Sequence, residues 1–304
     1  MPSRFGIAVI LAFWLAVTGY IGYRDVWPRY FSDAPPPIAI DLADEATQQA
    51  PTRWTIFRGD AKIGTLSTRM DYQAADDSFR FVNSYTKLTL EAGKFGVAKV
   101  ELELPSLTTT VRVNRSGALL EQSMQGEIRL LIGSIDLGNG SAEVTGRVVD
   151  GMLRGRCLVR YPMTATVPNI DRELEPVPVP AGQVLNPMMP VNRLRDVTPG
   201  RRWVIREVDP LRDAIAVLGK EILGQNKLGA GIGMQAAENR ELIAEVSRDT
   251  ETLPRRGSAD VVCRIIRYRS EQVTAQTWVA VADGRVMRQE ASLAGERLRF
   301  DRED

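Results

Sequence analysis

The feature that most constrains the fold of this chain is a two-residue alternation of apolar and polar side chains, which recurs through residues 53–304 between closely spaced glycine turns. The stretch AKVELELP, for example, places Val100, Leu102 and Leu104 between charged neighbours. Successive side chains of a β-strand point to opposite faces of a sheet, so this period gives each strand one apolar face. Asp-Gly at positions 150–151 is the strongest of the hairpin signals between such runs. The pattern predicts an antiparallel meander rather than βαβ units.

The last of these runs, TWVAVADGRVMRQEASLAGERLRF, predicts two consecutive hairpins with an Asp-Gly turn and then an Ala-Gly turn. A two-residue loop at 283–284 would set Val281 opposite Val286 and Trp278 opposite Gln289. Both faces of the first hairpin are then apolar near its turn. One face carries Trp278, Ala280, Met287, Ala291 and Leu293, and the other carries Val279, Val281 and Val286. A sheet with one solvated face would not show this pattern, whereas a curved sheet covered on its concave face would.

We therefore expect a mainly β fold, built as a curved, half-barrel-like antiparallel sheet with one or two helices. A helix is expected at 209–223, DPLRDAIAVLGKEIL, where Asp209 can cap the N-terminus and apolar residues recur at helical spacing. Residues 162–200 contain too many prolines for a central strand and are expected to form a long crossover. This crossover, which includes Met188 and Met189, could be a lid across a groove or a segment packed on the core.

The N-terminal region predicts a membrane anchor. No charged residue lies between Phe5 and Tyr23, and such a helical run spans about 28 Å, enough to cross a hydrocarbon core. A cleaved signal peptide is the alternative, but the uncharged run continues past the small residues at 17–19, which favours an uncleaved signal-anchor. The expected organisation is a transmembrane helix within 1–31, an acidic tether at 32–52 and a β-rich domain at 53–304. This predicts single-pass insertion in the inner membrane with an exocytoplasmic (periplasmic) β-rich domain.

The composition excludes several classes of function. The chain contains no histidine, which excludes Ser-His-Asp and Cys-His catalysis, histidine-ligated metals and haem. No motif of carboxylates, lysines or tyrosines replaces them, so we expect no enzyme activity, no cofactor and no metal site. The net charge of +1 argues against a nucleic-acid partner. Cys157 and Cys263 could pair as a disulfide in an exported domain, or remain two small buried side chains.

Arginine far outnumbers lysine, and one group of arginines falls on a single expected strand. Arg154, Arg156 and Arg160 share one face of the strand that follows the Asp-Gly turn, whereas the residues between them are mostly apolar. One interpretation is a cationic stripe that faces anionic head groups or glycans. The other, which is favoured, is a solvated outer face with Glu and Asp residues nearby.

Three features together resemble a known family: the export segment, the motif W-x-I-x-x-G-x-x-x-I-G at Trp54–Gly64, and the closing stretch WVAVADGRVMRQEASLAGERLRF. They resemble uncharacterised bacterial envelope proteins built on the lipoprotein-carrier (LolA/LolB-like) half-barrel. The resemblance implies a curved antiparallel sheet with helices on its concave side and an apolar cavity for acyl chains. The chain departs from these carriers in its helical anchor and in having no lipobox cysteine.

These observations lead us to expect a membrane-anchored, exocytoplasmic module that is not an enzyme. It would bind an apolar or amphipathic ligand, such as a lipid or a lipoprotein acyl chain, or assist envelope assembly. Its expected partners are the membrane and a lipid or an envelope protein. The alternative is a structural or protein-interaction domain with a filled core and no ligand. The first candidates for a ligand cavity are Trp54, Met188, Met189, Trp203 and Trp278.

Overall fold

The computed structural model describes residues 13–20, 50–95, 98–115, 117–160, 169–179, 184–185, 191–194, 197–207, 241–255, 259–269, 274–293 and 296–303. Residues 13–20 are helical, and no helix in these described ranges is long and apolar enough to cross a bilayer. The helix expected at 209–223 lies outside the described residues, as do Met188, Met189 and most of the expected anchor.

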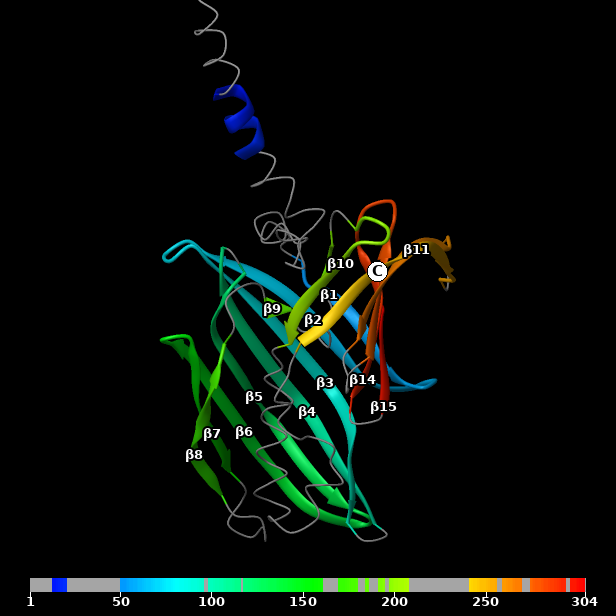
Figure 1. The fold of residues 1–304 in the computed structure, drawn as a ribbon. Coiled ribbons are helices and arrows are strands. Elements are labelled where there is room, and N and C mark those ends of the chain that lie inside the picture. Colours follow the sequence, from blue (N-terminus) through cyan, green and yellow to red (C-terminus); the bar gives the residue numbers. More distant parts are fainter. Residues whose placement is uncertain are drawn as a thin grey trace, which may run out of the picture.

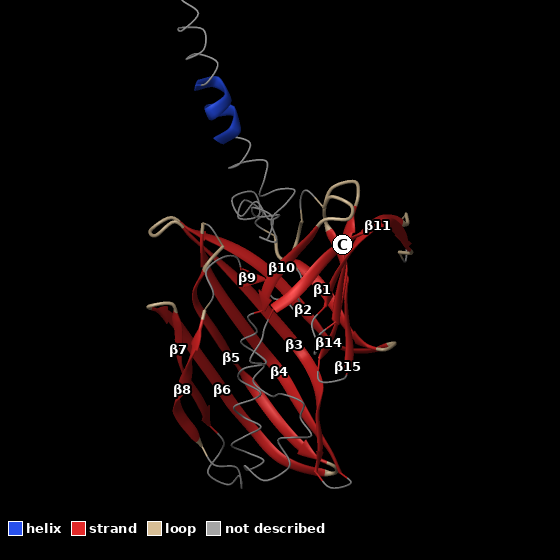
Figure 2. Ribbon diagram, viewed as in Figure 1, coloured by secondary structure: helices blue, strands red, loops and turns tan. Residues whose placement is uncertain are grey.

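Strands dominate the described part of the chain (Figure 2), which confirms the prediction of a mainly β fold. In chain order they are β1 Thr52–Arg58, β2 Ala61–Gln73, β3 Ser78–Phe95, β4 Ala98–Asn114, β5 Leu119–Ile132, β6 Ile135–Val149, β7 Met152–Arg160, β8 Ile170–Pro178, β9 Val184–Leu185, β10 Arg202–Glu207, β11 Glu241–Leu253, β12 Val261–Arg269, β13 Thr274–Ala280, β14 Val286–Leu293 and β15 Glu296–Arg302. The first strand begins at Thr52, the last residue of the expected tether.

All of these strands belong to one open sheet, in the order β8-β7-β6-β5-β4-β3-β2-β1-β15-β14-β13-β12-β11-β10-β9 (Figure 1). Neighbours pair antiparallel, except for the short parallel pairing of β10 with β9. Strands β1 to β8 form a first meander in chain order, and strands β10 to β15 form a second. Because β1 pairs with β15, the two meanders join into a single sheet. The predicted antiparallel meander is thereby confirmed.

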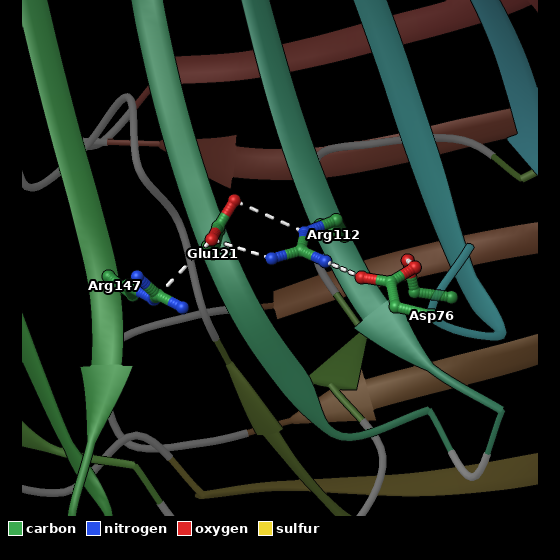
Figure 3. Close-up of polar contacts among 5 residues, drawn as sticks. Asp76, Arg112, Glu121 and Arg147 are labelled. Carbon is green, nitrogen blue, oxygen red and sulfur yellow. Dashed lines mark hydrogen bonds and ion pairs between the residues drawn. The ribbon is translucent and has the colours of Figure 1, made fainter. Parts of the chain in front are cut away.

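The two meanders share one core. The main cluster of buried side chains contains Leu107 and Val159 from the first meander and Val246 and Tyr268 from the second. Figure 3 shows strands of the second meander, in faint orange and brown, crossing behind those of the first. Both meanders are hydrogen-bonded into one sheet, so the sheet must bend for its halves to pack against each other. We call the face that points into this core the inner face.

Two smaller clusters lie beside the main core. One continues along the inner face of the first meander toward its turns and includes Met70, Phe79 and Leu119. The other includes Cys263 and Trp278, which lie on strands β12 and β13 next to residues of the main core. Side chains alternate along a strand, so this cluster lies on the opposite face of the second meander. The apolar character of both faces of the closing hairpin is thus confirmed, with Trp278 5% and Val279 2% exposed.

Strands β4 and β5 approach each other closely where their register shifts, between Glu103 and Leu107. Gly126 pairs with Leu107 at this point. A Cβ atom on residue 126 would lie 2.5 Å from the carbonyl oxygen of Ser106 and 2.9 Å from the Cα of Leu107. The two backbones can come this close because residue 126 has no side chain.

The Asp-Gly turn at 150–151 forms as its sequence predicts. Asp150 and Gly151 both have positive φ, of 52° and 72°, and Val149 pairs directly with Met152. A two-residue loop with both φ values positive matches the right-handed twist of the strands that it joins. Local turn chemistry therefore sets the register of β6 against β7.

The predicted two-residue loop at 283–284 is wrong. The Ala280 amide donates to the carbonyl of Arg285, and the Gly284 amide donates to the carbonyl of Ala280, so the loop contains residues 281–284. A further register shift follows between Trp278 and Val279, and Trp278 pairs with Arg288 instead of Gln289. Ala291 consequently joins the main core. In the next hairpin Leu293 pairs with Glu296, and the two residues of the predicted Ala-Gly turn lie outside the described residues.

The prediction of a crossover over all of 162–200 is wrong in part, because β8 and β9 lie within this range and form the two edges of the sheet, where prolines are tolerated. Residues 191–194, further along this range, pack on the closing hairpin. The Leu194 amide donates to the carbonyl of Gly284, the Val286 amide donates to the carbonyl of Asn192, and Leu194 is buried in the main core. The Asn192 side chain accepts a hydrogen bond of 2.7 Å from Arg302. Residues 191–194 are therefore a segment packed on the core, which is the second of the two alternatives given for the crossover.

Candidate functional site

Charged side chains form one row across five neighbouring strands of the first meander. Each residue of the row is the direct partner of the next in the sheet, so the row runs across the strands. Its members are Arg80 on β3, Arg112 on β4, Glu121 on β5, Arg147 on β6 and Arg154 on β7. Directly opposed Cα atoms are about 4.5–5.5 Å apart, so neighbouring side chains of the row can interact.

The row projects from the outer face of the sheet. Phe79, Val111 and Leu153 precede members of the row by one residue, and all three are buried on the inner face. Because side chains alternate along a strand, the charged residues that follow them point away from the core. Figure 3 shows Arg112, Glu121 and Arg147 side by side along the first meander.

A groove of about 620 Å³ lies over the row. We call it the arginine groove and define it by its charged lining residues: Arg80, Arg112, Glu121, Arg147, Arg154, Arg156 and Glu173. With five arginines and two glutamates, this lining carries three more positive than negative charges. The residues Thr110, Ser123 and Thr145 add hydroxyl groups beside the charged row. Such a lining favours an anion that accepts hydrogen bonds.

At one end of the row the arginines are paired with carboxylates of the chain itself. Arg112 forms a two-point contact with Glu121, at 3.1 Å from Nε to Oε2 and 2.6 Å from Nη2 to Oε1, and it also contacts Asp76 (Figure 3). The hydrogen bond to Glu121 is the largest cause that raises the pKa of Arg112. Asp71, on β2, lies 3.2 Å from Arg80 and 3.0 Å from Arg69.

Ser78 and Arg112 both act on Asp76 at the same end. The Ser78 hydroxyl donates to Asp76 at 2.7 Å and is the largest cause that lowers the pKa of this carboxyl group, with Arg112 lowering it further. Asp76 therefore stays ionised below its usual titration range. This end of the row is electrostatically balanced before any ligand arrives.

At the other end of the row the arginines have weaker partners. Arg147 lies 3.5 Å from Glu121, beyond normal hydrogen-bond distance, and its side chain is 74% exposed. Among the described residues, Arg154 has neither an ion pair nor a hydrogen bond through its side chain. Arg156, in contrast, makes a two-point contact with Asp171, at 2.7 Å and 2.8 Å, which lowers the pKa of Asp171. The uncompensated charge of the groove therefore resides on Arg147 and Arg154.

A second groove, of about 710 Å³, lies over the junction of the two meanders and is lined by residues of β1, β14 and β15. Two of its arginines share one carboxylate: Asp301 lies 2.5 Å from Arg288 and 3.1 Å from Arg299. The Arg288 guanidinium also lies over the Trp278 ring, 5.9 Å from its centroid. Charges in this groove are thus compensated internally, which makes it the weaker candidate.

The predicted cavity residues do not come together around a groove. Trp54 is fully buried in the main core, where its Nε1 donates to Thr68 at 3.2 Å, and Trp203 lies in the same core. Trp278 belongs to the separate cluster on the opposite face. None of these three tryptophans lines either of the two grooves. Met188 and Met189 lie outside the described residues.

Both cysteines are free and buried, so the disulfide that their presence allowed is absent. Cys157 belongs to the main core and Cys263 to the cluster on the opposite face of the second meander. Two side chains on separate faces of a sheet cannot meet the short Cβ–Cβ distance that a disulfide requires. Burial raises the pKa of both thiols, that of Cys263 to about 11.

Sequence reasoning found only part of the arginine groove. The alternation on β7 identified Arg154 and Arg156, whereas Arg80, Arg112 and Arg147 were not connected with them. In the sequence, two opposed arginines of the row can be found at equal distances on either side of a hairpin turn, as Arg147 and Arg154 are around Asp150-Gly151. Within the described residues, no three metal-ligating side chains come together. Comparisons with protein-family models, with curated proteins and with solved structures find no match for this chain.

Proposed function

We propose that this chain is a membrane-anchored, non-enzymatic β-rich module that binds an amphipathic ligand, with the anionic group of the ligand in the arginine groove. The observation that carries the proposal is the surplus of positive charge in this groove, five arginines against two glutamates, in a row that sets Arg147 directly opposite Arg154. Like charges directly opposite each other destabilise a sheet. An anion bound between them would remove the repulsion and accept charge-assisted hydrogen bonds.

The tryptophans expected to line a cavity are instead buried in a packed core. Trp54 is 0% exposed and Trp203 8% exposed within one continuous cluster. This burial favours the alternative of a filled core for the inner face. The proposal therefore places the ligand on the outer face, where the groove and its charges are.

Apolar residues of β8 support an amphipathic ligand rather than a small inorganic anion. Pro176, which is exposed, and Leu174, whose side chain also packs against the main core, line the arginine groove on the side of β8. An alkyl or acyl portion of a ligand would contact these two side chains while its anionic group contacts the arginines. The expected gain is about 25 cal/mol for each Å² of apolar surface removed from water.

The anchor is part of the proposal on the strength of the sequence. The uncharged run from Phe5 to Tyr23 has the length of a membrane span, and the acidic, proline-bearing stretch 32–52 has the composition of a tether. Such an anchor would hold the β-rich domain beside the exocytoplasmic surface of the inner membrane. The groove would then meet lipids or lipid-linked molecules at high local concentration.

Lipid binding by the full-length chain in a neutral detergent tests this proposal. We expect native mass spectrometry to detect an anionic phospholipid in preference to a zwitterionic one, and binding to weaken with added salt. Neutralising the five arginines of the groove to Gln should abolish the preference. The control is Arg69→Gln, an exposed arginine on β2 that does not line the groove. Equal retention of both lipids, or of neither, would contradict the proposal.

A further inference from the structure

We infer that Arg147 and Arg154 form a subsite for the phosphate group of a lipid. This inference rests on the proposed function and assigns both the position and the chemistry of the anionic group. It begins with the hairpin between β6 and β7, in which a two-residue turn fixes Arg147 opposite Arg154. In such a hairpin the pair lies about 5.5 Å apart at Cα, with both side chains on the outer face. One anion can therefore contact both guanidinium groups.

The two ends of the charged row differ in how far their arginines are already occupied. Arg80 and Arg112 have Asp71, Asp76 and Glu121 as partners at hydrogen-bond distance. Arg147 has one carboxylate beside it, that of Glu121, which stands 3.5 Å away and is held more closely by Arg112, and Arg154 has no ion pair among the described residues. An incoming anion therefore meets unshared positive charge only at the β6–β7 end.

The chemistry of this end favours phosphate over carboxylate. Arg156 in the same groove shows what a carboxylate requires, because the two oxygens of Asp171 are satisfied by one guanidinium fork at 2.7 Å and 2.8 Å. Two guanidinium groups can share one carboxylate, as Arg288 and Arg299 share Asp301, but each then engages only one of its oxygens. A tetrahedral phosphate presents oxygens in several directions, so each guanidinium can engage its own pair.

Hydroxyl groups extend the subsite. Thr145 lies two residues before Arg147 on the same face of β6, and its partner on β5 is Ser123. Both line the groove and can donate to a phosphate oxygen that the arginines do not reach. Pro176 lies beyond them on β8 and is exposed. A phospholipid that places its phosphate on Arg147 and Arg154 would direct its apolar part toward this side chain.

Calorimetric titration of the full-length chain in a neutral detergent tests the subsite. The probe is dihexanoyl phosphatidic acid; the comparison ligands are inorganic phosphate, octanoate and dihexanoylglycerol. The test variant is Arg147→Gln/Arg154→Gln. Its matched control is Arg69→Gln/Arg115→Gln, which removes the same charge from two exposed arginines of the first meander that do not line the groove. Circular dichroism and thermal melting verify that both variants are folded.

We expect the test variant to weaken phosphatidic acid binding by about tenfold or more, because two charge-assisted contacts are lost. The control should change it by less than about threefold. Glu121→Gln should tighten binding, since it removes the carboxylate that competes for Arg147. Octanoate and dihexanoylglycerol should bind weakly or not at all.

The contrary outcomes separate this inference from the proposed function. Equal weakening by both double variants would overturn the subsite, because binding would then depend on the total charge of the chain and not on these two arginines. If octanoate bound as tightly as phosphatidic acid, the assignment of the subsite to a phosphate would be wrong. If inorganic phosphate bound as tightly, the assignment to a lipid would be wrong. A wild-type chain that binds no anionic amphiphile at all would refute the proposed function itself.

Discussion

Gly126→Ala gives a sharp test of the register shift between β4 and β5. The new Cβ would lie 2.5 Å from the Ser106 carbonyl oxygen and 2.9 Å from the Leu107 Cα, both of which are backbone atoms. Real Cβ contacts essentially never fall below 3.0 Å. Relief therefore requires the two strands to move apart, which weakens ladder hydrogen bonds and the packing of Leu107 in the main core.

The magnitude follows from two opposing effects. Overpacking of a well-packed core costs about 1–3 kcal/mol, and a clash with backbone falls at the upper end of that range. Replacing a strand glycine by alanine returns about 0.5–1 kcal/mol, because the unfolded chain loses conformational freedom. The expected net loss is about 2 kcal/mol, which corresponds to a urea midpoint lower by about 1 M for a slope near 2 kcal/mol/M.

Gly146→Ala is the matched control, because this glycine also lies in a strand of the first meander. Its Cβ would meet only side-chain atoms, the Cδ1 of Leu153 at 3.0 Å and the Cγ of Gln122 at 3.3 Å, and both can turn aside. We expect its free energy of unfolding to stay within about 1 kcal/mol of wild type. Urea unfolding followed by tryptophan fluorescence measures both variants. Equal midpoints, or a higher midpoint for Gly126→Ala, would refute the close approach of β4 and β5.

Three further predictions concern buried polar groups. Thr109 is fully buried and, within the described part of the chain, its hydroxyl has no hydrogen-bond partner. Thr109→Val should therefore raise the free energy of unfolding by about 1–2 kcal/mol in urea titrations. A loss of stability would show that the hydroxyl is hydrogen-bonded, for example to a bound water. Burial raises the pKa of Cys263 to about 11 and also raises that of Cys157, so neither thiol should react with a disulfide reagent at pH 8 until urea is added. Detection of fewer than two thiols in urea would instead reveal a disulfide. Burial raises the pKa of Tyr268 to about 12. The stability that the buried, protonated side chain contributes is complete below a pH of about 10, where tyrosine in the unfolded chain also keeps its proton. It declines as the pH rises toward 12. Tyr268→Phe should therefore show a shallower loss of stability in alkaline unfolding curves, and an unchanged slope would contradict the raised pKa.

Local chemistry made part of the fold predictable. The Asp150-Gly151 turn follows from the two residues themselves, because few other pairs adopt positive φ at both positions. The turn at Gly284 has the same Asp-Gly sequence, yet it forms a longer loop. Gly284 lies against the carbonyl oxygen of Leu194, at a point where a Cβ would be only 2.6 Å away. The segment that packs against this loop, around Leu194, is remote from it in the sequence, so the local sequence does not predict the length of the loop.

The arginine groove was predictable only strand by strand. Alternation placed Arg154 and Arg156 on one face of β7, because that requires no knowledge of the neighbours. The alignment of Arg112 with Glu121 depends on the register shift between Arg112 and Val113, on the side of the pair that faces the β4–β5 turn. This shift moves the rest of β4 by one residue relative to β5, so the row could not be found by counting residues from the turn.

The pairing of β1 with β15 sets the order in which the sheet can be completed during synthesis. Each hairpin of the first meander can close as soon as its second strand leaves the ribosome, but Trp54 of β1 must wait for Arg302 of β15. Until then one edge of β1 and the inner apolar face of the first meander lack their partners. Unpaired edges and exposed apolar faces promote aggregation, and such distant pairings form slowly. The nascent chain should therefore depend most on chaperones between the synthesis of β8 and that of β15.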